Sequence, residues 1–129
     1  MPTIHSIGIT GSLVEAVSTT EKFIPGTPWM TAGAVGKVRP TYEVVYATGN
    51  LVVAFAYQVC NVENSIDSTT AVTSYYGAGV NYPGSGYTDI SATTAPKQLV
   101  RFGWYVKLSS GSTQSFGYVV GSCDIMECA

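Results

Sequence analysis

Residues Lys97–Val120, KQLVRFGWYVKLSSGSTQSFGYVV, decide the fold that we expect of this chain. Side chains in the first half of this stretch alternate between apolar and polar, and a strand points successive side chains to opposite faces of its sheet. The apolar side chains that share one face of the expected strand 99–108 are Val100, Phe102, Trp104, Val106 and Leu108. Arg101 and Lys107 fall on the opposite face. The pattern predicts a strand with a buried inner face and a basic outer face in water.

The second half of the stretch predicts a return strand that forms a hairpin with the first. Residues 109–112 (SSGS) are small and include a glycine, as a tight reversal requires. We expect Phe116, Tyr118 and Val120 to lie on the inner face of the return strand. Burial of one large apolar side chain contributes about 1.5–3 kcal/mol, but a lone hairpin is not stable in water. The hairpin therefore needs a second sheet from the rest of the chain.

A second hairpin is predicted from Tyr42–Thr48 (YEVVYAT) and Leu51–Val62 (LVVAFAYQVCNV), with its turn at residues 48–50. The second of these strands is apolar on both faces, as strands buried on both sides are. We expect it at the centre of a sandwich, or with its outer face against another subunit.

Shorter strands and polar loops account for the remainder. Ser12–Phe23 fits a helix with Ser12 as cap and Glu15 at the capping-box position, but its β-branched residues favour a strand. Two prolines make Phe23–Met30 a turn-rich connection. The sequence as a whole predicts an all-β protein, a single domain over residues 1–129. Its expected form is an antiparallel β-sandwich, jelly-roll or immunoglobulin-like, with about seven to nine strands.

Composition narrows the classes of partner. Charged residues make up 11% of the chain, hydrophobic residues 46%, and the net charge is −2. The six basic residues form no cluster, so we expect no nucleic-acid partner. No apolar run approaches the roughly 20 residues of a membrane span. The N-terminal MPTIHSIGIT has neither region of a signal peptide, and either synthesis without one or a mature chain is expected. The low charge favours an extracellular or virion-surface location.

The glycine-rich loop over residues 75–89 is the best candidate for a ligand site. Tyrosines offer stiff contact area with a polar tip, and Asn and Asp can bind sugar hydroxyls. The candidate ligand-binding residues in this loop are Tyr75, Tyr76, Asn81, Tyr82, Tyr87 and Asp89. The alternative is structural: the tyrosines pin the loop onto its own sheet.

Cysteines and titratable residues give no pattern of an enzyme or metal centre. The number of cysteines is odd, so the chain can form one disulfide or keep all three thiols free: Cys60, Cys123 and Cys128. Cys60 is the best candidate for a thiol that is buried like a small apolar side chain. The spacing of the cysteines differs from that of zinc sites. His5 is the only histidine, and no nucleophile elbow accompanies it. We expect no cofactor and no metal, and the sequence leans away from an enzyme.

Three functions remain from different classes. The first is a non-enzymatic structural or assembly subunit that works as a homo-oligomer on a surface or in a virion. The second is a lectin-like module that binds carbohydrate or a protein ligand through the loop 75–89. The third is a small hydrolase.

Overall fold

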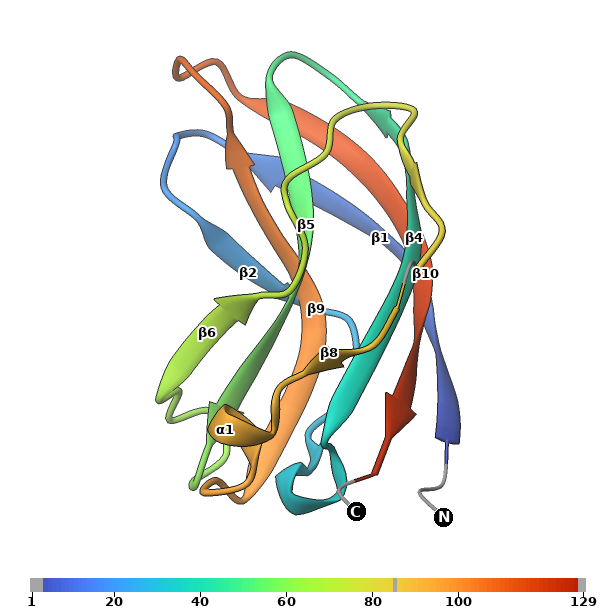
Figure 1. Ribbon diagram of the computed structural model, residues 1–129. Helices are drawn as coiled ribbons and strands as arrows, with labels where there is room; N and C mark the ends of the chain where they lie inside the picture. Colours follow the sequence, from blue (N-terminus) through green and yellow to red (C-terminus); the bar gives the residue numbers. More distant parts are fainter. Residues whose placement is uncertain (1–3, 85, 128–129) are drawn as a thin grey trace.

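Two antiparallel sheets face each other in the computed structural model, which describes residues 4–84 and 86–127 (Figure 1). This arrangement confirms the predicted all-β sandwich. The first sheet, here called sheet A, contains β1 (Ile4–Ala16), β10 (Ser115–Met126), β4 (Lys37–Ala47), β7 (Asn81–Tyr82) and β8 (Thr88–Asp89). The second, sheet B, contains β2 (Lys22–Pro25), β3 (Met30–Thr31), β9 (Leu99–Leu108), β5 (Leu51–Cys60) and β6 (Ser68–Ala71). A 3-10 turn (Ala32–Ala34) and the short helix α1 (Ser91–Thr94) complete the described elements.

The strand order is that of a jelly roll. Sheet A runs β1-β10-β4-β7, with β8 also on β4, and sheet B runs β2-β9-β5-β6, with β3 also on β9. Strands β2 and β3 both pair with β9, and β7 and β8 both pair with β4. If each of these two pairs is counted as one strand, the chain passes to the other sheet at every connection except the one from β5 to β6. Two interlocked Greek keys give this order, so the jelly-roll alternative is the one observed.

Both predicted hairpins are wrong in their pairing, although their strands are correctly placed. Strand β9 pairs with β2, β3 and β5, whereas β10 pairs with β1 and β4. Strands β4 and β5 likewise lie in different sheets. Alternation and turn residues specify where a strand begins and reverses, but they do not specify its neighbour. Here each reversal crosses the gap of about 10 Å between the layers, so the two strands that it joins lie in opposite sheets.

The return strand β10 also presents the opposite face from the one predicted. Its inward residues are Ser115, Gly117, Val119, Gly121, Cys123 and Ile125, and all but Gly121 are buried. Phe116, Tyr118 and Val120 point outward. The reason is space, because large side chains of sheet B reach across to β10. A Cβ on Gly117 would collide with Leu51, and one on Gly121 would lie 3.0 Å from the Trp104 ring and 2.7 Å from Tyr42.

Strand β1 replaces the helix considered for Ser12–Phe23. A register shift between Ile9 and Ser12 inserts a bulge against β10, and a bulge inverts the alternation of a strand. Ile9 and Val14 are therefore both buried, although they are five residues apart, and Leu13 points into water. The predicted turn-rich connection, Phe23–Met30, contains most of β2 instead of being entirely irregular.

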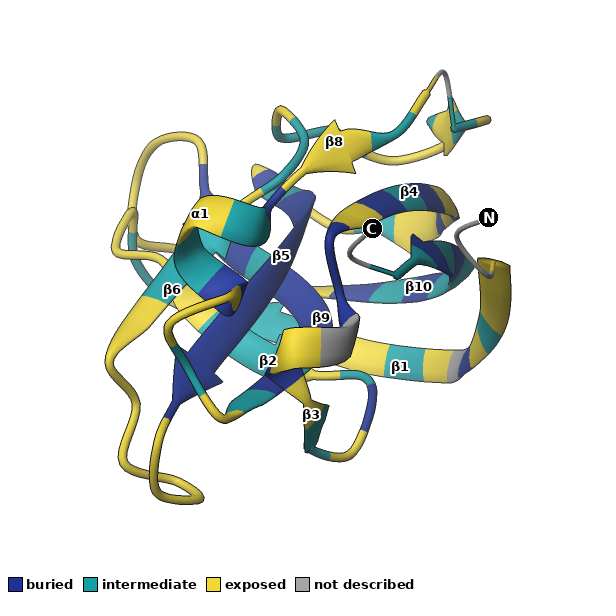
Figure 2. Ribbon diagram, turned by 60° about the horizontal axis from the view of Figure 1, so that its bottom comes forward, coloured by how far each residue is buried: buried dark blue, intermediate teal, exposed yellow. Residues whose placement is uncertain are grey.

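The core is centred on Trp104 of β9. Its ring lies 5.2 Å from that of Tyr42 and 5.7 Å, edge-on, from that of Phe55. Phe55 stacks on Phe102 at 5.8 Å. Strand β5 is buried along nearly its whole length (Figure 2), and its outward Ala54 and Ala56 are fully covered within this one chain. The predicted burial of β5 on both faces is thus confirmed.

Replacement of Gly121 by alanine is expected to lower the free energy of unfolding by about 1–3 kcal/mol, because the added methyl overpacks the contact with Trp104 and Tyr42. Gly8→Ala is the matched control, since nothing lies within 4 Å of its Cβ position on β1. Urea denaturation of both variants measures the difference. Equal stability of Gly121→Ala and the unmodified protein would contradict this packing.

Candidate interaction surface

The outer face of sheet A carries apolar side chains that are exposed to water. Leu13 of β1 lies opposite Tyr118 of β10, and Tyr118 lies opposite Tyr46 of β4, so the three form one row across the sheet. Phe116 follows in the next outward row of β10. The exposed fraction is 76% for Leu13 and 47% for Phe116. We call these residues, together with Val45, the apolar patch.

A second bulge enlarges the apolar patch. The register between β10 and β4 shifts at Tyr118 and Val119, which leaves Val45 without a partner residue on β10. As a result Val45 and Tyr46, adjacent in sequence, are both exposed. An ordinary strand would have turned one of them inward. Contiguous exposed apolar area of this kind marks interaction sites in soluble proteins.

A groove of about 530 Å³ adjoins the apolar patch at the open side of the sandwich, between the edge strands β1 and β2. Its lining comes from both sheets: Leu13, Val14, Glu15, Lys22, Phe23, Ile24, Pro25 and Phe116. Glu15 and Lys22 face each other across it at 4.0 Å. The groove therefore offers apolar walls with one charge of each sign.

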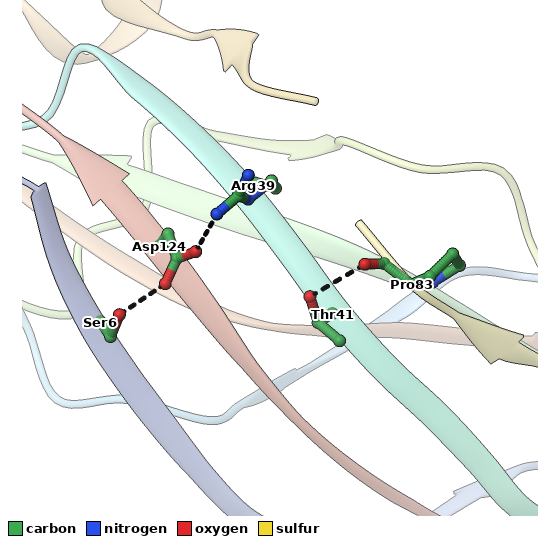
Figure 3. A network of polar contacts seen from close by, with 5 residues as sticks. All are labelled: Ser6, Arg39, Thr41, Pro83 and Asp124. Carbon is green, nitrogen blue, oxygen red and sulfur yellow. Dashed lines mark hydrogen bonds and ion pairs between the residues drawn. The ribbon is translucent and has the colours of Figure 1, made fainter. Parts of the chain in front are cut away.

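The other half of the outer face of sheet A is polar, and at its centre Asp124 and Arg39 form an ion pair. Figure 3 shows Asp124 between Ser6 and Arg39, with each residue on a different strand. Ser6 Oγ donates to Oδ1 of Asp124 at 2.6 Å, and Arg39 Nη2 donates to Oδ2 at 2.7 Å. These two hydrogen bonds hold the pKa of Asp124 below its usual value. The Tyr87 ring lies 4.8 Å from the Arg39 guanidinium carbon, so Arg39 has partners on two sides.

Two of the predicted loop tyrosines pack against the core. Tyr82 stacks on Tyr42 with 5.4 Å between ring centroids, and Tyr76 lies 5.8 Å from Tyr82. Burial raises the pKa of Tyr42 to about 12. Backbone hydrogen bonds join Tyr76 to Val53 of β5, and residues 79–80 to Val44 of β4. Tyr76 and Tyr82 thus help to close the side of the sandwich between β4 and β5.

The other four predicted ligand-binding residues do not converge on one site. Tyr75 lies on the outer face of sheet B, with the Lys107 Nζ 4.3 Å above its ring, and Tyr87 packs on Arg39 over sheet A. Asn81 is exposed opposite Glu43. Asp89 accepts hydrogen bonds from the backbone and hydroxyl of Ser91, which lowers its pKa and fixes the start of α1. Recognition of a ligand by this loop stays a prediction.

The two cysteines that the structure describes are buried free thiols. Cys60 lies in β5 of sheet B and Cys123 in β10 of sheet A. Burial raises the pKa of both, that of Cys123 to about 12, so neither is a reactive thiolate at neutral pH. Cys128, the third candidate, lies outside the described residues.

The next feature is the set of possible metal ligands in the described ranges, 4–84 and 86–127. No group of three or more His, Cys, Asp and Glu side chains there is placed to hold a metal ion. His5 pairs with Glu127 at 2.9 Å on an exposed strand end. No helix within those ranges is long and apolar enough to span a membrane.

Solved structures of infectious bursal disease virus share this fold. The Gt strain structure aligns at a TM-score of 0.60 and 13% identity, covering 97% of this chain and 33% of that one. The VP2 subviral particle gives 0.57 and 14%, covering 97% and 32%, and a T=1 particle gives 0.57 and 16%, covering 97% and 31%. This chain spans about a third of the length of those proteins. No protein-family model matches the sequence, and no curated protein matches it.

The apolar patch was missed in the sequence because its residues were assigned to the wrong side. Phe116 and Tyr118 were expected inside, and the exposed Leu13 follows a bulge that alternation does not reveal. One signal was present: the opposite face of residues 115–121 holds Ser115, Gly117 and Gly121. Three such small residues on one face indicate a close approach by another layer.

Stability should depend on pH through Asp124. Its pKa in the folded protein is lowered, so its stabilising contribution is present above its unfolded pKa of about 3.9 and is lost as the pH falls through the folded value. Asp124→Asn should therefore reduce the melting temperature at pH 7, and the difference from the unmodified protein should shrink toward pH 2.5. Because the ion pair is partly exposed, the loss at pH 7 should be about 1 kcal/mol or less.

Glu43→Gln is the control, since it removes a carboxylate from the same sheet without breaking an ion pair described here. Its melting temperature should change by the same small amount at both pH values. A loss for Asp124→Asn that is as large at pH 2.5 as at pH 7 would contradict the assignment.

Proposed function

We propose that this chain is a non-enzymatic structural subunit that assembles with copies of itself through the apolar patch, on an extracellular or virion surface. The observation that carries the proposal is the outward orientation of Leu13, Tyr46, Phe116 and Tyr118 on one sheet face. A face like this is stabilised when a partner removes it from water, by roughly 25 cal/mol for each Å² buried.

A second copy of the chain suits this surface. The groove beside the patch holds Glu15 and Lys22, which carry opposite charges. A two-fold interface brings the same surface of two subunits together, so each negative group can meet the positive group of the partner.

The likeness to particles of infectious bursal disease virus supports an assembly role by analogy of fold. Jelly rolls serve as shell subunits as well as lectin domains. The low content of charged residues, 11% of the chain, also suits a surface that is covered by neighbouring subunits.

The two alternatives have less support. In a lectin-like module, the loop 75–89 would hold the ligand, but Tyr76 and Tyr82 direct much of their ring area to Tyr42 and to each other. In a hydrolase, the only histidine would activate a nucleophile, whereas the partner of His5 in this structure is the carboxylate of Glu127 at 2.9 Å. A carboxylate orients a catalytic histidine but does not replace the nucleophile.

Replacement of Leu13 and Phe116 together by serine is expected to shift the protein from oligomer to monomer. Large apolar side chains at the centre of an interface each contribute about 1–2 kcal/mol to binding, so the double variant should associate at least tenfold more weakly. Sedimentation velocity between about 1 and 100 μM measures the association. Val62→Ser, at an exposed apolar residue outside the patch, should leave it unchanged. A strict monomer for the unmodified protein over this range would overturn the proposal.

A further inference from the structure

The outer face of sheet B, on the side of the molecule away from the apolar patch, holds an arginine in a fixed orientation. Arg101 donates from Nε to the side-chain oxygen of Gln58 at 2.9 Å, and Gln58 in turn donates to the Thr69 hydroxyl at 3.1 Å. The guanidinium carbon lies 4.4 Å from the centre of the Trp29 ring and 5.7 Å from that of Phe23. Hydrogen bonding and stacking together restrict the guanidinium plane before any ligand arrives.

Arg101 has no anionic partner among the described residues. Arg39 and Lys97 form ion pairs with carboxylates at 2.7 and 3.1 Å, whereas Glu63, the acid that acts on Arg101 electrostatically, makes no ion pair with it. Arg101 is half-buried beside Trp29 and Phe23, and this burial lowers its pKa. A partly desolvated cation is stabilised by an anion, and the terminal nitrogens of a guanidinium match a carboxylate with two hydrogen bonds.

A second cation on an aromatic ring lies farther along the same strand. The Lys107 Nζ lies 4.3 Å from the centre of the Tyr75 ring, and Lys107 has no ion pair within the described part of the chain. Lys107 is six positions after Arg101 on β9, which corresponds to roughly 20 Å. Tyr105 stands between the two cations, with its ring edge-on to Phe23 at 6.4 Å. We call this row of side chains the cation–aromatic strip.

We propose that the cation–aromatic strip binds an acidic polysaccharide, with carboxylates of its uronic acid units at Arg101 and Lys107 and its sugar rings over Tyr105 and Phe23. The spacing of the cations spans several sugar units, and amphipathic aromatic rings suit the mixed apolar and polar faces of sugars. An extended acidic peptide is less suited, because β9 is an interior strand whose backbone already pairs on both sides. Nucleic acid needs clustered positive charge, and this chain has a net charge of −2.

Titration calorimetry with a hexamer of galacturonic acid tests the proposal, with the neutral xylan hexamer as comparison ligand. The unmodified protein should bind the acidic hexamer at least tenfold more tightly than the neutral one. Binding should weaken between 50 and 300 mM salt, because two charge contacts are screened. Arg101→Met should reduce the affinity about tenfold or more. Lys37→Met removes the same charge from sheet A and should leave the affinity unchanged.

Three results would overturn the proposal. The first is equal binding of the neutral hexamer, and the second is equal loss of affinity in Arg101→Met and Lys37→Met. The third is equal or tighter binding of poly-glutamate that also depends on Arg101, which would assign the strip to acidic peptides. The melting temperature of each variant shows that it is folded, and Trp29→Phe, which keeps a ring beside Arg101, should retain most of the affinity. Because sheet A is not involved, these results are independent of self-association through the apolar patch.

Discussion

The contact of Trp104 and Leu51 with the glycines of β10 shapes the whole molecule. These two side chains of sheet B reach across the interior to Gly121 and Gly117 of sheet A. The space is available only because neither glycine has a side chain. The inner face of β10 is therefore small, and its large apolar residues are on the other side. Interior packing and the exposed apolar surface follow from the same constraint.

Two bulges refine that surface. One in β1 turns Leu13 outward, and the other, between β10 and β4, brings Val45 and Tyr46 to the surface side by side. Bulges re-aim side chains at functional positions, and in this protein both add apolar residues to the same face. The polar half of that face is different in kind, because Arg39 and Asp124 satisfy each other. The apolar half instead exposes Leu13, Val45, Tyr46 and Phe116 to water.

The sequence predicted the strands more reliably than the connections between them. Alternation located β9, and a continuous apolar run located β5 to within two residues, because each has an inner face formed by large side chains. The sheet to which each strand belongs depends on packing between layers, and neighbouring residues do not encode it. For β10 the rule that the apolar face is the inner face failed. Gly117 accommodates Leu51, which lies more than 60 residues earlier, and Gly121 accommodates Trp104 of the other sheet.

For the candidate sites, too, the sequence predicted the position of side chains along the chain but not their contacts. The loop 75–89 was recognised from its composition, but the role of Tyr82 depends on Tyr42, which lies on a distant strand. Arg101 and Lys107 were correctly expected on the outer face of their strand. Their stacking on Trp29 and Tyr75 arises from chain segments that only the fold brings together.

Thiol labelling of a cysteine placed at position 116 tests the central claim most directly. Cys60 and Cys123 are expected to react slowly because both are buried, so in a Cys128→Ser background a Phe116→Cys thiol should give the fast signal. The account predicts rapid labelling of the native protein at high dilution and progressively slower labelling as the concentration rises, because the outward face becomes covered. A thiol at position 116 that reacts only on unfolding, at every concentration, would show that this face points inward and would contradict the account.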